Sequence, residues 1–178
     1  MAPWRNAIRD IAVPGVGSLT PGYRSWSEPA KTMASAIDAA VSAAQANDAA
    51  AFTEATDDLY RVDREQLAML LGAVARELLE RSHPDGLDSD DAEQLLQSCI
   101  RFAAAWYKPL DSDSLIRALT GALGISELEE SPLLDGAAVV SHGLLLIADQ
   151  LTNRTQELAT VLDSALAELM RAQTVELP

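Results

Sequence analysis

Cysteine and histidine are scarce in this chain. Its 178 residues include one cysteine and two histidines. Cys99 alone cannot form an intramolecular disulfide or a zinc motif of the Cys-x-x-Cys kind. Because it lies in an apolar stretch between Ser98 and Ile100, we expect a buried small hydrophobe rather than a reactive thiol. We predict no metal and no other cofactor.

Motifs for nucleotide binding and for nucleophilic catalysis are also missing. The sequence has no glycine-rich phosphate loop, and the pair Gly15 and Gly17 neither follows a strand pattern nor directly opens a helix. It has no Gly-x-Ser-x-Gly nucleophile elbow. Catalysis would then depend on paired carboxylates, whose separation a sequence does not give. We therefore predict that the protein is not an enzyme.

Positive charge and long apolar runs are lacking as well. Residues 31–178 carry ten basic and 25 acidic side chains, so we expect neither nucleic acid nor an anionic membrane as partner. No apolar run approaches the roughly 20 residues that cross a bilayer, and the first residues lack the apolar block of a secretory signal. We expect a cytoplasmic protein. The excess of arginine over lysine and the abundant alanine suggest a GC-rich bacterial genome.

Residues 1–29 differ in composition from the rest of the chain. They hold four of the eight prolines and three of the nine glycines, with no sustained helical or strand period. We predict an irregular N-terminal arm, 1–29, followed by an acidic helical domain, 30–178. The aromatic side chains Trp4, Tyr23 and Trp26 are costly to leave in water, so the arm should pack on its own domain or on a partner.

From residue 30 onward, apolar residues recur at helical spacing, which predicts an all-α bundle of about six helices. Helix starts are marked by residues whose side chains can cap the first turn: Ser27, Asp48, Asp63, Asp88 and Asp111. The last two lie in a repeated Leu-Asp-Ser-Asp sequence, which we attribute to recurring capping chemistry rather than to duplication. The expected helix ends lie before His83, before Pro109 and at Gly124.

The segment 135–173 is predicted to form one helix of nearly forty residues. Its apolar residues keep a four-and-three spacing, and the phase is preserved across Asn153, although Asn153 with Gln156 could also open a new helix. We expect the first half, with Leu144-Leu145-Leu146, to be central. A helix of about 55 Å would overhang a compact domain, so its second half is the expected subunit interface.

Three groups of residues resemble fragments of functional sites. Glu80 and His83 have the Glu-x-x-His spacing of helical di-iron proteins, but Val139 precedes His142 by three residues, so the second pair is missing. The acidic residues of 85–93 lack the ligand pattern of a calcium-binding EF-hand. We expect His142, in an apolar segment, to be a hydrogen-bonded core histidine.

Two functional hypotheses of different classes follow. The first is a non-enzymatic interaction or regulatory protein that forms a homodimer through its last helix and meets a protein partner at the arm. Its interface candidates are Trp4, Tyr23, Trp26, Leu158, Val161, Ala165 and Leu169. The alternative is a small-molecule-binding, ligand-sensing helical domain with an apolar pocket. Its pocket candidates, which would otherwise fill the core, are Phe102, Trp106, Tyr107 and Cys99.

Overall fold

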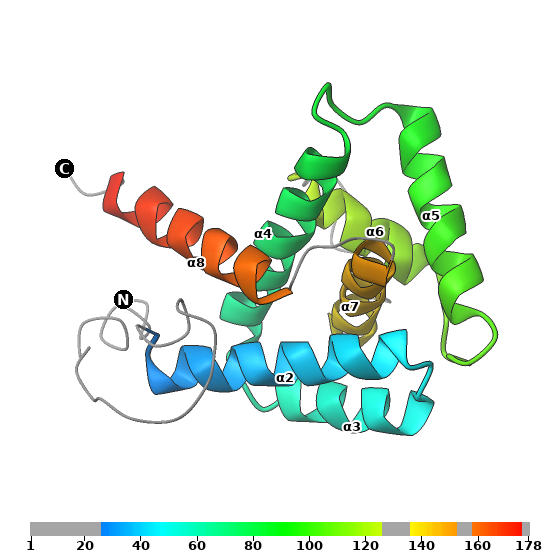
Figure 1. The fold of residues 1–178 in the computed structure, drawn as a ribbon, viewed down its shortest axis with the longest axis horizontal. Helices are drawn as coiled ribbons and strands as arrows, with labels where there is room; N and C mark the ends of the chain where they lie inside the picture. The colour runs from blue at the N-terminus through cyan, green and yellow to red at the C-terminus, as the bar shows by residue number, and fades with distance from the viewer. Residues whose placement is uncertain (1–25, 126–135, 153–157, 176–178) are drawn as a thin grey trace.

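A computed structural model describes residues 26–125, 136–152 and 158–175, and these ranges contain helices but no strands. The helices are α2 (Glu28–Gln45), α3 (Ala49–Leu59), α4 (Arg64–Ser82), α5 (Ser89–Ala103), α6 (Ser112–Ala122), α7 (Gly136–Thr152) and α8 (Leu158–Val175). The predicted all-α bundle is confirmed (Figure 1). Within the described ranges, no helix combines the length and the apolar character needed to cross a membrane.

Helix α7 lies at the centre of the bundle. It contacts α2, α4, α5 and α6, and Figure 1 shows these helices arranged around it. Its three consecutive leucines, 144–146, are all buried, because apolar side chains on every side of a helix require neighbours on every side. The central position expected for this part of the chain is thereby confirmed.

Aspartate side chains begin four of the helices, as the sequence predicts. Asp48, Asp63 and Asp111 each accept a backbone N–H of the first turn, as in the 2.9 Å bond from the Ser114 N–H to Asp111 Oδ2. The cap at Asp88 is reciprocal, since Asp91 also accepts the Asp88 N–H. Capping thus accounts for both copies of the repeated sequence.

Helix α5 ends earlier than expected. Its last residue is Ala103, so Trp106 and Tyr107 lie in the turn that follows and not in the helix before Pro109. The Tyr107 N–H still donates to the Ala103 carbonyl oxygen at 2.8 Å. Proline disfavours the helical conformation of the residue before it, which is consistent with a chain that leaves the helix here.

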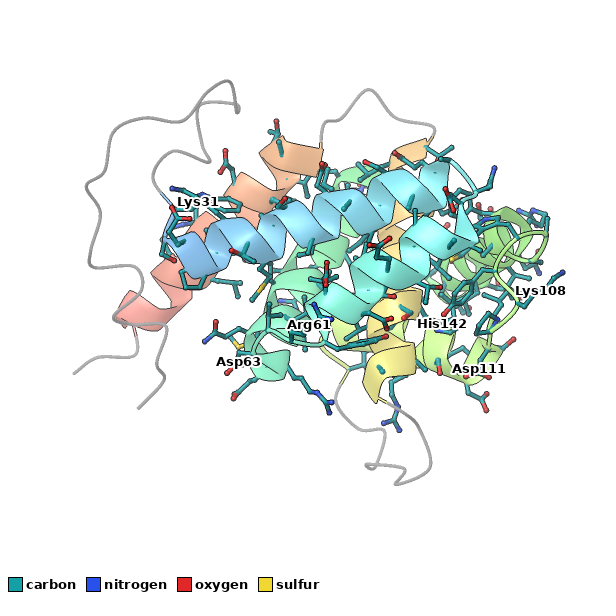
Figure 2. The ribbon with its side chains drawn as sticks, turned by 90° about the horizontal axis from the view of Figure 1, so that it is seen from below. Lys31, Arg61, Asp63, Lys108, Asp111 and His142 are labelled. Atoms are coloured by element: carbon teal, nitrogen blue, oxygen red, sulfur yellow. The ribbon has the colours of Figure 1, made fainter. Side chains whose placement is uncertain are left out.

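The segment 135–173 is not confirmed as one helix. The structure describes two helices, α7 and α8, and residues 153–157, which include Asn153 and Gln156, lie outside the described ranges. The axes of α7 and α8 point in different directions in both views (Figures 1 and 2). Helix α8 packs against α4 and α2 of the same chain, and these two helices cover its apolar stripe.

Most of the described residues expected to form a subunit interface are covered by their own chain. Leu158, Val161 and Ala165 are buried in the chain's own core, and Leu169 is half-buried against it. Trp26 is also half-buried, and its side chain forms a hydrogen bond with Asp163 of α8. The described end of the arm therefore packs on its own domain. Trp4 and Tyr23 lie outside the described residues.

Candidate functional site

The aromatic residues among the pocket candidates come together, and Phe52 packs against two of them. Phe52 of α3 is fully buried, with ring centroids 5.5 Å from Trp106 and 5.3 Å from Tyr107 in edge-to-face contacts. Phe102 packs on Trp106 at 6.2 Å. These contacts are those of a packed core cluster.

Cys99 is buried, as expected from its apolar surroundings. Burial raises the pKa of its thiol to about 12, and the negative charge of Asp149 contributes in the same direction. The thiolate, which is the reactive form of cysteine, is therefore strongly disfavoured. Cys99 acts as a small apolar side chain of the core.

A buried hydrogen-bond network ties α7 to the segments that follow α3 and α5. The Tyr60 hydroxyl lies 2.8 Å from the Ala137 carbonyl oxygen and 2.8 Å from Ser141 Oγ. Ser141 also hydrogen-bonds Tyr107, whose pKa is raised by burial. Two tyrosines distant in sequence thus share one serine of the central helix, a contact that no local pattern indicates.

His142 is a hydrogen-bonded core histidine, as predicted. Its Nδ1 lies 2.6 Å from the Ala138 carbonyl oxygen, and its Nε2 lies 2.8 Å from the Asp111 backbone nitrogen. A carbonyl oxygen can only accept and a backbone N–H can only donate, so Nδ1 donates to Ala138 and Nε2 accepts from Asp111. Both ring nitrogens therefore form hydrogen bonds within the chain, and the side chain is fully buried.

His142 fixes the start of α6. Figure 2 shows Asp111 and His142 side by side, and the Asp111 carboxylate caps α6 while its N–H is bound by the imidazole. Hydrogen bonds from Ser114 lower the pKa of Asp111. Asp111 thus connects His142 of the central helix α7 to the first turn of α6.

Replacing His142 by glutamine is expected to lower the free energy of unfolding by about 1–2 kcal/mol, measured by urea denaturation. The glutamine carbonyl can still accept the Asp111 N–H, but the donor to Ala138 is lost, and one hydrogen bond contributes about 0.5–1.5 kcal/mol. His83→Gln is the control, expected to cost less than about 1 kcal/mol, because that imidazole is only half-buried. Equal effects of the two substitutions would contradict the role of His142.

The other predicted site fragments have structural roles. His83 is the C-cap of α4, and its Nδ1 donates to the Leu79 carbonyl oxygen at 3.2 Å. In the acidic segment 85–93, Asp88 and Asp91 form the cap of α5. In the part of the chain that the structure describes, no three His, Cys, Asp or Glu side chains are placed to hold a metal ion.

An apolar hollow among the described residues lies between α4, α6 and α7 and has a volume of about 360 Å³. We call it the α4–α6–α7 groove. Small or apolar residues of the three helices line it, among them Met69, Gly72, Ala118, Gly121, Val140 and Gly143. Arg117 contributes the one charged side chain of the described lining. The sequence does not indicate this site, because its residues belong to three separate helices.

Comparisons with protein-family models, curated proteins and solved structures find no match to this chain. Its function is therefore argued from its own residues.

Proposed function

We propose that the protein is a non-enzymatic small-molecule-binding protein whose site is the α4–α6–α7 groove. The supporting observation is a hollow of about 360 Å³ with an apolar lining between helices of a bundle. Ligand pockets typically have volumes of about 300–1,000 Å³, are mostly apolar and contain few polar groups. Ligand binding is the alternative function that the sequence suggests, but the site proposed here consists of residues other than Phe102, Trp106, Tyr107 and Cys99.

Gly72 supports the proposal, because the fold itself gives no reason for a glycine there. It lies inside α4, where glycine costs about 1 kcal/mol relative to alanine. A Cβ atom at this position would meet no atom within 4 Å. Positive φ angles among the described glycines occur at Gly86 and Gly124, not at Gly72. Gly72 therefore keeps open a space that a larger residue would fill.

Charge defines the class of ligand that we propose. The described lining of the groove has no carboxylate and includes the guanidinium of Arg117, although the whole chain has a net charge of −14. An anionic group is repelled by most of this protein and is favoured near this arginine. Met69, which is 41% exposed at the groove, offers an adaptable apolar contact. The ligand is accordingly a small molecule with an apolar body and one acidic group.

The fluorescent probe 1-anilinonaphthalene-8-sulfonate, which has an apolar body and an anionic group, tests this proposal. We expect the full chain to bind it and Gly72→Leu to weaken binding at least tenfold, because the leucine fills the groove. Ala39→Leu adds the same side chain at an exposed position of α2 and is expected to bind the probe like the unaltered chain. Equal binding by both variants would contradict the groove as the site.

Arg117→Gln tests recognition of the ligand's acidic group separately from binding of its apolar body. We expect this variant to bind decanoate about tenfold more weakly and decanol unchanged, each measured by displacement of the probe. Unchanged decanoate binding would contradict an acidic ligand while leaving the groove as an apolar site. Thermal unfolding of every variant confirms that the compared proteins are folded.

A further inference from the structure

Met69 is the residue of the described groove lining whose side chain a mild oxidant can modify. The chain has four methionines, and the structure describes the side chains of Met33 and Met69. Met33 is buried in α2, with 6% of its surface exposed, whereas Met69 of α4 is 41% exposed and lines the α4–α6–α7 groove. Small solutes can therefore reach the thioether of Met69 from the solvent.

A peroxide converts the thioether of methionine to a sulfoxide. The O–O bond of the peroxide breaks, and one of its oxygen atoms forms a bond to Sδ. The proton on that oxygen passes to the leaving oxygen, which departs as water or as an alcohol. The sulfur loses two electrons and the peroxide gains them. The side chain stays uncharged, so the reaction changes its polarity and not its charge.

The other described sulfur atoms are protected from the same oxidant. Cysteine reacts with peroxides as the thiolate, and Cys99 is fully buried with its pKa raised by burial to about 12. Met33 belongs to the hydrophobic core. Among the described residues, Met69 is therefore the sulfur that a peroxide meets first.

Oxidation at this position alters the wall of the groove. Apart from Met69 and Arg117, the described lining consists of alanine, glycine, leucine and valine residues. An apolar ligand would strip water from a sulfoxide oxygen there, and a polar group that loses water without a new hydrogen bond costs free energy. If Arg117 donated to the sulfoxide instead, the same donor would be lost to the acidic group of a ligand. Both courses weaken binding.

We propose that Met69 is an oxidation site through which a peroxide weakens ligand binding in the α4–α6–α7 groove. The effect on binding rests on the proposed function, whereas the oxidation of Met69 does not. Methionine sulfoxide is reduced back to methionine by dedicated reductases, so the modification is reversible. The groove is thereby sensitive to the redox state of its surroundings.

Mass spectrometry of the full chain after treatment with hydrogen peroxide tests the modification. Trypsin cleaves after lysine and arginine, so it separates Met33 and Met69 into the peptides 32–61 and 65–76. We expect the peptide with Met69 to gain one oxygen atom about tenfold faster than the peptide with Met33, because only Met69 is exposed. Equal rates would remove Met69 as the preferred site.

Binding of 1-anilinonaphthalene-8-sulfonate to the treated chain tests the consequence. We expect oxidation to weaken binding about tenfold and a methionine sulfoxide reductase to restore it. Met69→Leu keeps an apolar side chain but has no sulfur, so its affinity should not respond to peroxide. Met33→Leu is the matched control and should respond like the unaltered chain, since leucine replaces methionine in a core at little cost. An equal response of the two variants would contradict the role of Met69.

The outcomes separate this inference from the proposed function. If the untreated chain does not bind the probe, the proposed function and the effect of oxidation on binding both fail, while mass spectrometry still decides whether Met69 is oxidised first. If the chain binds the probe in the groove but oxidation leaves the affinity unchanged, the site stands and its regulation is overturned. We expect oxidation to weaken decanol as well as decanoate binding, because it alters the apolar lining, in contrast to Arg117→Gln.

Discussion

Replacing Phe52 by alanine is expected to lower the free energy of unfolding by about 3–5 kcal/mol. The ring is fully buried and packs edge-to-face on both Trp106 and Tyr107. Its removal leaves a cavity that the rigid neighbouring rings cannot close, and it also removes two aromatic contacts worth about 0.5–1.5 kcal/mol each. Urea denaturation of the variant and of the unaltered chain measures the difference.

The cavity in this variant gives a second measurement. Apolar cavities created by truncation stay dry and can bind small aromatic molecules. We expect toluene to raise the melting temperature of Phe52→Ala more than that of the unaltered chain. Stabilisation of the unaltered chain that is lost in Gly72→Leu would mean that toluene binds in the α4–α6–α7 groove. Stabilisation that persists in Gly72→Leu would mean that the cluster already encloses a pocket, as the sequence suggested for Phe102, Trp106 and Tyr107.

This cluster shows which parts of the structure a sequence can predict. Helix starts are local, since a capping aspartate lies within three residues of the N–H that it binds, and Asp88 and Asp111 were therefore identifiable. The cluster also contains Phe52, which is about fifty residues from Trp106 in the chain. Which ring fills the space between others depends on tertiary packing, and no spacing rule contains that information.

The α4–α6–α7 groove was not predictable for a related reason. It depends on the relative placement of three helices, and Gly72 taken alone indicates only a weaker helix.

A chain that ends at Ala159 is expected to lose its fold. The deletion removes most of α8, including the fully buried Val161 and Leu162, and uncovers the faces of α4 and α2 on which they pack. Burial of each such side chain stabilises the fold by about 1.5–3 kcal/mol, and the uncovered partners lose a similar amount. The total is comparable with the roughly 5–15 kcal/mol by which a whole domain is stable.

The same truncated chain separates an internal from an intermolecular role of α8. If α8 served mainly to join two subunits, the shortened chain would be a folded monomer and the full chain a dimer, which light scattering and circular dichroism would show. We expect instead a loss of helical signal and of cooperative unfolding, whatever the oligomeric state of the full chain. A chain shortened by residues 176–178 alone is the control and should unfold like the full chain, since α8 ends at Val175. The described apolar residues Leu158, Val161, Leu162 and Ala165 of α8 are buried within one chain, which favours an internal role for this helix.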